Sequence, residues 1–600
     1  MRVSDYIASF LRDQGVDLVF TITGAGNIRL IESVSDAGIA YVCPHHEQAA
    51  VMAALTRMRM NGRPAVCLVT GGPGAANTLI AVADAHLDSL PCIIIAGQEK
   101  AEFLSPPNAM RGKGVQGLDM VDIMKSVTKF ATCVTRAGDI RRAMEQAFHE
   151  AYAGRPGPVW IDVPQDVQWT QVDPTTLAGY SPPAAASVPM QEAARTTLDL
   201  LRTAQRPLLW VGHGIRLAGC EAEFQQLFDQ LGVPALVSWQ AADLVPDSHP
   251  LFVGRAGTYG QRWANLALQN CDLLITLGTR LAIPQRGYND AEFARAAKKV
   301  VVEIDPIEMD KFKFHVNVPV LGNVKDFIGA LQGALDATGG DRQLSAGVAP
   351  WMEKCRDWRD RYPMSQPPED ASAAVNSYWF IERLSEHLAP DSVVVTDMGT
   401  SLTCTHATIR LKQGQRLMTS TGLGEMGFGL PGAIGAALGA AGRPVVLIAG
   451  EGSLMMNVQE LQTLKHLGLP IKIFLLNNNG YLTIKHTHHA LYRSAGQASA
   501  TSPESGVSFP DFSKLAPAFG FEFRRTTNAQ GMDNWIQEVL AAPGCLFAEI
   551  AMSEFQELIP KSSLKVRPDG NIVSPPLEDL YPFLSPEQLA REMIIPMLPS

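Results

Sequence analysis

The feature that most constrains this chain is a repeated alternation of short apolar runs with helix-length segments. The runs are rich in β-branched residues and apolar on both faces, and they occupy residues 17–23, 65–70, 92–96, 159–163, 208–211, 273–277, 300–304, 393–396, 445–449 and 471–476. Runs of this kind, separated by helices, are typical of parallel sheets that are covered on both faces. The alternation therefore predicts an α/β fold made of doubly wound parallel sheets.

The chain has 600 residues, which is too long for one hydrophobic core and predicts about three or four domains. Two segments have the composition of linkers: residues 173–190, rich in Pro, Ala, Ser and Thr, and residues 339–374. We therefore expect an N-terminal domain (1–172), a central domain (190–340) and a C-terminal domain (375–555). Residues 556–600 form a Pro-rich tail that is too apolar to stay free, so we expect it to pack on the body.

Composition excludes several classes of protein. The net charge of −10 argues against nucleic acid as the main partner, because phosphate binding needs a basic footprint. No apolar run approaches the ~18 residues that span a membrane, and residues 1–20 resemble an amphipathic helix rather than a signal peptide. The nine cysteines form no Cys-x-x-Cys pair, which favours reduced thiols. The sequence predicts a soluble, cytoplasmic protein with small-molecule partners.

Two neighbouring strands end in residues that can bind a cation and an anion. The first tip carries Gly-Glu-Gly-Ser at 450–453, a helix is expected at 457–467, and the second tip carries Asn-Asn-Asn-Gly-Tyr at 477–481. In a parallel sheet both tips lie at one edge, where ligands bind. The glycines and the helix N-terminus after Ser453 suit a phosphate. Glu451, Asn478 and a backbone carbonyl add oxygen ligands that suit Mg²⁺, whereas the alternative is an ordinary pair of turns.

This pair of tips resembles the motif of thiamine-diphosphate enzymes, in which Gly-Asp-Gly-Ser precedes Asn-Asn. The usual Asp is Glu451 here, so the metal must shift or the loop must retreat by one methylene. Upstream, Gly-Leu-Gly-Glu-Met at 422–426 resembles the acetohydroxyacid synthase stretch that holds the aminopyrimidine. The resemblance implies a metal bound by Glu451, Asn478 and Gly480, a diphosphate near Gly399, Thr400, Ser401, Gly450, Gly452 and Ser453, and a pyrimidine held by Gly424 and Met426.

The N-terminal domain offers the carboxylate that thiamine chemistry needs. Pro-His-His-Glu-Gln-Ala-Ala at 44–50 follows a short apolar strand and opens an Ala-rich helix, where a Glu is also a common capping residue. The segment resembles the family's His-Glu motif, and Gly-Gly-Pro-Gly at 71–74 resembles the turn that follows it. The resemblance implies that Glu47 stabilises the imino tautomer of the cofactor, whose nitrogen removes the thiazolium C2 proton. It also assigns Gly74 and Asn77 to the cofactor.

Three further residues of this domain match catalytic positions of acetohydroxyacid synthases. Gly24 matches a glycine beside the thiazolium, Gln116 a glutamine of the substrate pocket, and Lys129 a lysine near the reaction centre. Taken singly, each is typical of a surface residue.

The central domain carries a set of strand-end motifs. Gly-His-Gly at 212–214 follows one strand, and a lone Gly-x-Gly is a weak signal. The whole set resembles the FAD-binding domain of acetohydroxyacid synthases, although relatives without flavin keep the same fold. His213 is expected to be a loop histidine with satisfied hydrogen bonds. The resemblance implies FAD contacts from Gly212, Gly214, Gly254, Thr279, Arg280 and Asp305.

The resemblance extends to about Phe555 and implies a carboligase. In that branch a 2-oxo acid, here pyruvate, is decarboxylated and its two-carbon carbanion is added to an acceptor carbonyl. The family's Gln-Trp pair is replaced by His486-Thr487, which opens the acceptor pocket and adds hydrogen-bond donors. The tail at 560–582 resembles that of relatives that act on nucleotide-linked keto sugars. The resemblance implies that the acceptor is a 2-oxo acid, a ketone or a nucleotide-linked keto sugar, with the keto sugar as the leading hypothesis.

Two other functions stay open. One is a decarboxylase without ligation or a flavin-dependent oxidase, and the other is a non-catalytic cofactor-binding paralogue, which only Glu451 supports. The family's active sites lie between subunits, so the resemblance also implies a homodimer or homotetramer.

Overall fold

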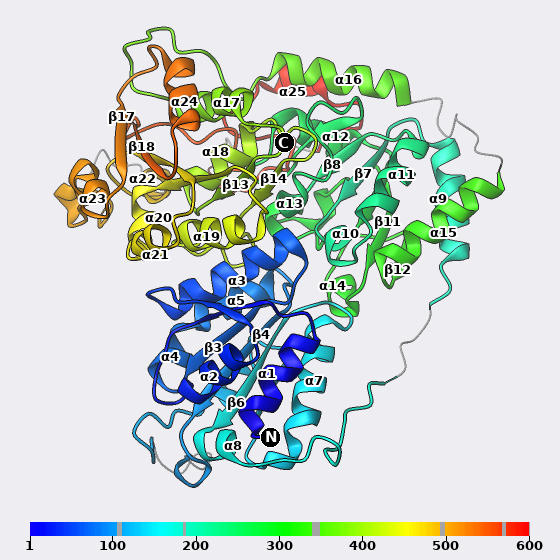
Figure 1. The fold of residues 1–600 in the computed structure, drawn as a ribbon. Helices are drawn as coiled ribbons and strands as arrows, with labels where there is room; N and C mark the ends of the chain where they lie inside the picture. The colour runs from blue at the N-terminus through cyan, green and yellow to red at the C-terminus, as the bar shows by residue number, and fades with distance from the viewer. Residues whose placement is uncertain are drawn as a thin grey trace.

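The computed structural model describes residues 1–104, 111–183, 188–338, 348–492, 499–566, 570 and 572–598. Within them lie three six-stranded sheets whose strands all run parallel, each covered by helices (Figure 1). The predicted α/β fold with three doubly wound sheets is confirmed. No helix of the described part combines the length and apolar character that a membrane span needs.

The first sheet has the strand order β2-β1-β3-β4-β6-β5. Its two faces carry separate cores, because successive strand residues point to opposite sides. Helices α1, α2 and α7 cover one face, and α3 and α5 cover the other. The bounds are β1 Leu18–Thr21, β2 Ala40–Val42, β3 Val66–Thr70, β4 Cys92–Gln98, β5 Phe130–Cys133, β6 Pro158–Pro164, α1 Val3–Asp13, α2 Ile28–Asp36, α3 Glu47–Asn61, α4 Pro73–Asn77, α5 Leu79–Leu87, α6 Met120–Met124, α7 Ile140–Tyr152 and α8 Gln165–Trp169.

The third sheet has the order β14-β13-β15-β16-β18-β17, which repeats the order of the first sheet. Its strand order reverses between β13 and β15, where an open sheet of this type binds ligands. The bounds are β13 Val393–Thr396, β14 Arg416–Met418, β15 Val445–Gly450, β16 Ile471–Asn477, β17 Glu522–Thr526, β18 Leu546–Ala551, α17 Ser377–His387, α18 Thr400–Thr408, α19 Gly429–Gly439, α20 Glu451–Met456, α21 Glu460–Leu467, α22 Leu482–Tyr492, α23 Phe512–Ala518 and α24 Met532–Ala541.

The central sheet is built differently, with the order β12-β11-β10-β7-β8-β9. Numbered within the domain this is 3-2-1-4-5-6 read from the other edge, the order of dinucleotide-binding sheets. Its switch point lies between β7 and β10. The bounds are β7 Pro207–Val211, β8 Ala235–Val237, β9 Phe252–Gly254, β10 Leu273–Leu277, β11 Lys298–Glu303, β12 Val318–Leu321, α9 Gln191–Thr203, α10 Gly214–Leu217, α11 Glu221–Leu231, α12 Arg262–Asn270, α13 Ile283–Arg286, α14 Pro306–Asp310 and α15 Val324–Ala337.

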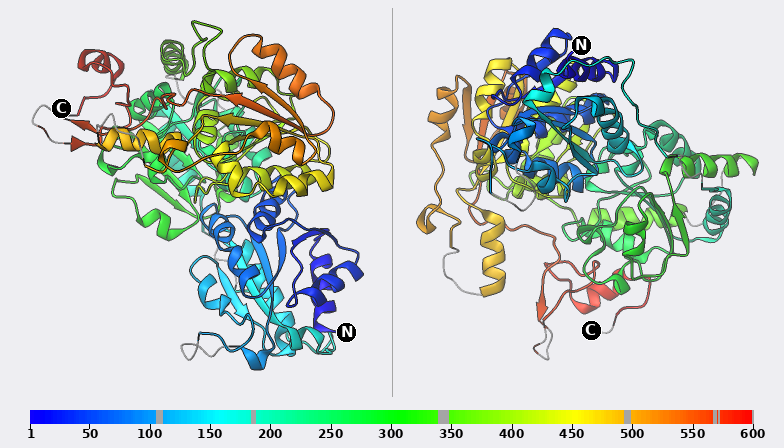
Figure 2. Two further views of the ribbon diagram at one scale, coloured as in Figure 1. Left: turned by 90° about the vertical axis from the view of Figure 1, so that its left-hand side faces the viewer. Right: turned by 90° about the horizontal axis from the view of Figure 1, so that it is seen from below.

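The first and third domains share one apolar core through helices α3 and α19. The helices approach so closely at Gly435 that a Cβ atom there would overlap the carbonyl group of Ala53. Alanine is therefore excluded at this position, and a glycine sets the distance between the two domains. The blue first domain lies below the yellow third domain in both side views (Figures 1 and 2).

The tail packs on the central domain, as expected. The Asn265 side chain donates to the Leu577 carbonyl at 2.8 Å, and Arg262 donates to the Leu580 carbonyl at 3.1 Å. In helix α25 (Pro586–Glu592), the Glu592 carboxylate accepts a hydrogen bond from the Trp358 indole at 2.8 Å. Trp358 belongs to helix α16 (Val348–Arg361), so the described part of the predicted linker 339–374 contains a buried, amphipathic helix rather than a simple connection.

The helix expected at 457–467 is present as α21, which begins at Glu460. A further short helix, α20 (Glu451–Met456), was not expected and precedes it. Gly450 serves as the N-cap of α20, and the chain leaves the helical conformation at Asn457 before α21 starts at Glu460. Glu451 therefore stands in the first turn of a helix, close to the positive end of its dipole.

Candidate active site

Glu451 lies between two adjacent strand tips. β15 and β16 pair in parallel to their ends, with Gly450 opposite Leu476, so the two predicted tips do lie side by side. Glu451 is 1% exposed, and its Oε1 accepts the backbone N–H of Gly480 at 2.7 Å. Burial raises the pKa of Glu451 to about 7. The longer Glu side chain thus reaches the second tip directly.

Asn478 offers a buried acceptor without a donor. Its side chain is 5% exposed, and its Oδ1 receives no hydrogen bond from the described residues. A buried acceptor without a partner is costly, and a cation would remove the cost. Nowhere in the described chain do three or more His, Cys, Asp or Glu side chains form a metal-type cluster. The donors at these tips are a carboxylate, an amide oxygen and backbone carbonyls, an oxygen set that a hard cation such as Mg²⁺ would fit.

The space beside these tips is open to an anion. Gly399 caps α18, and Gly450 caps α20 at the neighbouring strand. Apart from the glycine itself and its two chain neighbours, no atom of the described residues lies within 4 Å of the point where a Cβ atom would stand on either glycine. The hydroxyls of Ser401 and Ser453 accordingly bond within the protein, to the carbonyls of Asp397 at 2.8 Å and Met398 at 3.0 Å. The structure places the predicted diphosphate residues Gly399, Thr400, Ser401, Gly450, Gly452 and Ser453 on these two helix starts.

Asp397 links this edge to the expected pyrimidine turn, and the sequence interpretation missed it. It is 1% exposed. Its Oδ1 accepts the N–H of Gly427 at 3.0 Å, and its Oδ2 accepts that of Gly429 at 2.9 Å. Burial raises the pKa of Asp397 to about 6. Since Gly424 and Met426 directly precede these glycines, Asp397 holds their turn beside the diphosphate edge. An acid immediately after a buried strand was the signal available.

Glu47 opens helix α3 in the first domain. The His46 Nδ1 caps this helix by accepting the Gln48 N–H at 3.1 Å. Glu47 is 9% exposed, and its Oε2 accepts the Asn77 amide at 2.9 Å. Its Oε1 would stand 3.0 Å from a Cβ atom on Gly74. The structure thus brings together Glu47, Gly74 and Asn77, which the sequence predicted as one group.

The other predicted residues of this domain divide into two groups. A Cβ atom on Gly24 would meet Thr70, and one on Gly72 would meet the main chain of Gln116. Gly24 and Gln116 therefore lie at the Glu47 edge. Lys129 directly precedes β5, at the amino end of the strands and so at the opposite edge. Its ammonium donates to the Ala153 carbonyl.

A hydrogen bond between the third and first domains was not predicted from the sequence. Glu460 of α21 is fully buried, and its carboxylate accepts the backbone N–H of His45 at 3.0 Å. His45 stands two residues before Glu47, so a third-domain acid fixes the turn that carries the predicted activator. The sequence offers no signal for this contact, because the partners are 415 positions apart.

The central domain contains a cavity of about 360 Å³ at the switch point of its sheet. It is bounded by the tips of β7 and β10, by Leu87–Ser89 and 152–156 of the first domain, and by Thr421 and Gly422 of the third. Of the predicted FAD residues, Gly214, Thr279 and Arg280 line the cavity, whereas Gly212, Gly254 and Asp305 are not among its lining residues.

His213 lines this cavity, and its buried imidazole has no hydrogen-bond partner among the described residues. Both ring nitrogens are buried, and no described residue donates to or accepts from either of them. Burial lowers the pKa of His213 well below its usual value. The expectation of a satisfied loop histidine is therefore wrong, because the Gly-His-Gly turn directs the ring inward. A neutral imidazole with free hydrogen-bonding capacity fits a polar ligand in the cavity.

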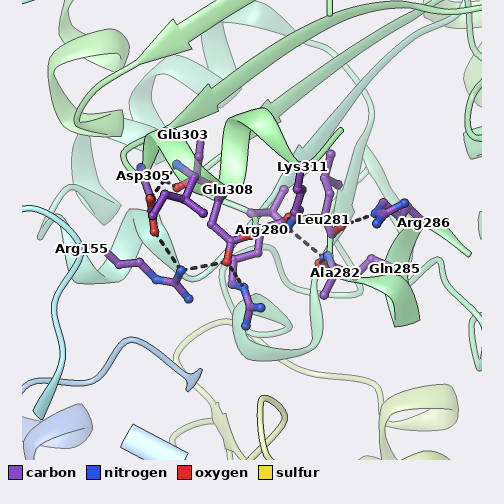
Figure 3. A network of polar contacts seen from close by, with 12 residues as sticks. Arg155, Arg280, Leu281, Ala282, Gln285, Arg286, Glu303, Asp305, Glu308 and Lys311 are labelled. Atoms are coloured by element: carbon purple, nitrogen blue, oxygen red, sulfur yellow. Dashed lines mark hydrogen bonds and ion pairs between the residues drawn. The ribbon is translucent and has the colours of Figure 1, made fainter. Parts of the chain in front are cut away.

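One end of the cavity carries a network of charges (Figure 3). Glu308 lies at its centre, 2.8 Å from Arg155 and 3.1 Å from Arg280, and it also pairs with Lys311. Asp305 accepts from Arg155 at 3.2 Å. Arg155 comes from the first domain and the acids from the central one, so the network joins the two domains and sets cations at the cavity wall.

The run of Lys and His residues forms part of helix α22. Lys485 is 7% exposed, and its ammonium lies over the Phe555 ring at 5.5 Å. The His486 Nε2 bonds to the Gln556 carbonyl oxygen at 2.7 Å, so the first residue of the tail holds this helix. Thr487 is exposed.

Comparisons with known proteins agree with this architecture. Residues 1–124 match the family described as thiamine pyrophosphate enzyme, N-terminal TPP binding domain; residues 194–331 match its central domain, and residues 397–550 its C-terminal TPP binding domain. The acetolactate synthase isozyme 1 large subunit of Escherichia coli (strain K12) is 32% identical over 93% of this chain and 95% of its own length. Isozyme 2 of the same organism is 31% identical over 93% and 97% of the two chains. The acetolactate synthase large subunit of Parasynechococcus marenigrum (strain WH8102) is 33% identical over 89% and 84%.

Proposed function

Because this chain belongs to the thiamine pyrophosphate enzymes and is an acetolactate synthase-like member of that family, we propose that it decarboxylates pyruvate and ligates the two-carbon unit to an acceptor carbonyl. The observation that carries the proposal is the pair formed by Glu451 and the unpartnered Asn478 oxygen at adjacent strand tips. Thiamine diphosphate supplies, when bound, the ring that accepts the electrons released as carbon dioxide leaves.

The third domain would hold Mg²⁺ and the diphosphate. Glu451, the Asn478 oxygen and the Gly480 carbonyl would bind the cation, and the N-termini of α18 and α20 would bind the phosphates. Asp397 would keep Gly424 and Met426 against the pyrimidine. These roles are supported by the open space beside Gly399 and Gly450.

Glu47 would act as the activating carboxylate, in a site shared by two subunits. Every hydrogen bond found for the Glu47 side chain in the described residues is made within its own domain. Apolar side chains remain exposed near Glu47 in the first domain and near the strand tips of the third domain: Leu79 (37%), Ile80 (46%) and Met456 (50%). A second copy would cover them and bring Glu47 to the partner's cofactor, as a homodimer or a dimer of dimers. Gly24 and Gln116 would line the same site, and Lys129 would need that second copy to approach it.

The central cavity would hold FAD. The dinucleotide-type strand order and the free imidazole of His213 support this assignment. His213, Gly214 and Thr279 would contact the ligand, with Arg155 and Arg280 near its phosphates and Asp305 behind them.

The acceptor would be larger or more polar than a simple 2-oxo acid. The exposed Thr487, in the middle of α22, leaves room on the acceptor side, and the neighbouring His486 is held by the Gln556 carbonyl oxygen. A nucleotide-linked keto sugar is the acceptor that we propose first, followed by a ketone or a 2-oxo acid. The cytoplasmic location also stays a prediction.

The decisive experiment is a pyruvate-consumption assay with thiamine diphosphate and Mg²⁺, with and without FAD, followed by mass analysis of the products. Acetolactate or a two-carbon adduct of an added carbonyl compound is the expected result. Free acetaldehyde alone would identify a decarboxylase, and acetate formed with reduction of the flavin would identify an oxidase. Bound cofactor without turnover of any 2-oxo acid would identify a non-catalytic paralogue.

A further inference from the structure

The three domains meet at one short turn, residues 419–425, which leads into the expected pyrimidine-binding residues. Asp88 of the first domain accepts the N–H groups of Thr421 at 3.1 Å and Gly422 at 2.7 Å. Gln240 of the central domain donates to the Thr419 carbonyl at 3.2 Å, and Arg59 donates to the same carbonyl at 3.1 Å. The position of this turn is therefore decided by side chains from outside its own domain.

Ser420 in this turn stands between two carboxyl groups. Its Oγ lies 2.6 Å from Asp84 Oδ1 of helix α5 and 2.6 Å from Glu425 Oε2. Asp84 is 1% exposed and Ser420 is 3% exposed. The remaining oxygens, Asp84 Oδ2 and Glu425 Oε1, are also buried and receive no hydrogen bond from the described residues.

The number of protons decides how this contact can exist. A hydroxyl group carries one proton and can donate one hydrogen bond, whereas an ionised carboxylate can only accept. Two contacts of 2.6 Å from one hydroxyl to two carboxyl groups are both hydrogen bonds only if one carboxyl group is protonated and donates to Ser420. Two ionised groups would instead leave one short oxygen–oxygen contact without a proton, in a buried place.

We propose that Asp84 and Glu425 share one proton through Ser420, and that this protonated triad is a positioning element that holds the turn before Met426 in the form that binds thiamine diphosphate. The inference rests on the proposed function, since it concerns the same cofactor. Glu425 stands between Gly424 and Met426, so its side chain sets the path of the main chain that would contact the pyrimidine. None of the three residues would touch the reacting atoms.

The charged surroundings favour the shared proton. Burial, with the nearby Asp88 and Glu425, raises the pKa of Asp84 well above its usual value, and only Arg59 and the Ser420 hydrogen bond oppose the shift. Burial raises the pKa of Glu425 to about 7, helped by Asp88 and Asp397. The acids that face the pair therefore outnumber the single nearby cation. Because these pKa values are raised in the ordered turn, protonation stabilises the ordered turn relative to the disordered one. This stabilisation is complete at low pH and is lost as the pH rises through about 7.

The test compares thiamine diphosphate binding, in the presence of Mg²⁺, by the full-length wild type and by Glu425→Gln. The Gln amide is a permanent donor to Ser420, which can then donate to Asp84 at any pH. Other titrating groups, including Glu451 and the diphosphate, affect the Kd of both proteins alike. Their effects therefore cancel in the ratio of the wild-type Kd to the variant Kd. We expect a ratio near one at about pH 6 and a ratio of about 10 at about pH 8.5, the size of a typical coupling between sites.

Two further variants keep the test independent of one mutation. Asp84→Asn puts the permanent donor on the other side of Ser420 and is expected to behave like Glu425→Gln. Ser420→Ala removes the bridge and is expected to weaken binding most at low pH, where the wild type gains from the proton. Glu192→Gln, at an exposed position of α9, removes a carboxylate elsewhere and is the matched control.

A ratio that stays constant with pH would overturn the proposal. So would weaker binding by both amide variants at every pH, because it would show that the turn needs two carboxylates rather than a proton. An independent readout is the infrared difference spectrum at neutral pH: the wild type is expected to show more absorption from protonated carboxyl groups than the Glu425→Gln, Asp84→Asn double variant. Failure of the wild type to bind thiamine diphosphate at any pH would refute the proposed function instead, and thus the two failures can be told apart.

Discussion

The first and third sheets have the same strand order, yet their ligand-binding edges carry opposite kinds of chemistry. Among the described residues, the ligand-binding edge of the third sheet leaves the Asn478 oxygen without a donor and, apart from chain neighbours, no atom within 4 Å of a Cβ position on Gly450. The first edge carries the Glu47 carboxylate, which Asn77 already partners. Strand order thus decides where a ligand can lie, and the side chains at the tips decide whether the edge binds the ligand or acts on it.

The two edges also differ in how they depend on the rest of the molecule. The third edge is assembled from tips that belong to neighbouring strands of one sheet. The first edge is held by Glu460 of another domain. The comparison therefore predicts that mutations in the third edge remove binding, whereas mutations in the first edge remove turnover and leave binding intact.

The variant Glu47→Gln tests this comparison most strongly. We expect turnover of pyruvate to fall about 10²–10⁴-fold, the range for loss of a group that moves a proton, while thiamine diphosphate still binds. Calorimetry of cofactor binding, measured beside the steady-state rate, checks both halves. Asp36→Asn, with a side chain 72% exposed, is the control in the same domain. A fully active Glu47→Gln enzyme would remove Glu47 from the mechanism.

Asn478→Ala tests the other edge. It removes the free acceptor, so we expect the apparent affinity for Mg²⁺ and thiamine diphosphate to fall at least about 10–100-fold, because even outer-shell partners of a metal cost that much. Chelation of divalent cations is expected to release the cofactor from the wild type. Asn534→Ala, at an exposed position of α24, is the control. Unchanged binding in Asn478→Ala would show that no cation is held there.

Glu460→Ala tests the dependence of the first edge on the third domain. The His45 N–H would lose its acceptor in a buried place, which costs about 1–3 kcal/mol of unfolding free energy. Turnover should fall about 10-fold, because the turn that carries Glu47 would move. Chemical denaturation and kinetics measure the two effects, and Glu460→Gln should restore most of both. Loss of stability with full activity would limit Glu460 to a structural role.

Thr487→Trp is expected to have the smallest effect, because it alters only the acceptor side of the site. A bulky ring at this exposed position should narrow the pocket and shift product formation toward small 2-oxo acid acceptors by about 10-fold. Competition between two acceptors in one reaction, read by mass analysis, measures the shift. An unchanged product ratio would place the acceptor away from α22.

Much of the fold followed from local pattern. Every apolar run that predicted a strand contains one, because the buried strands of a parallel sheet need apolar residues on both faces. β18 was missed although it lies inside the third sheet, since Glu549 interrupts its apolar run. That carboxylate is buried and is satisfied by the Asn477 side chain at 2.6 Å. A polar residue with a distant partner cannot be distinguished from an exposed one by pattern alone.

The sequence by itself determined the three sheets and the two neighbouring strand tips that carry Glu451 and Asn478, and its family resemblance grouped Glu47 with Gly74 and Asn77. These features depend on residues that are close along the chain or at the ends of successive strands, where spacing alone implies proximity. Only the tertiary structure decided that Glu460 holds His45, that His213 lies unpartnered in a cavity shared by three domains, and that Asp84 meets Glu425 through Ser420. Such contacts join residues hundreds of positions apart, and packing between domains, which has no local signature, brings them together.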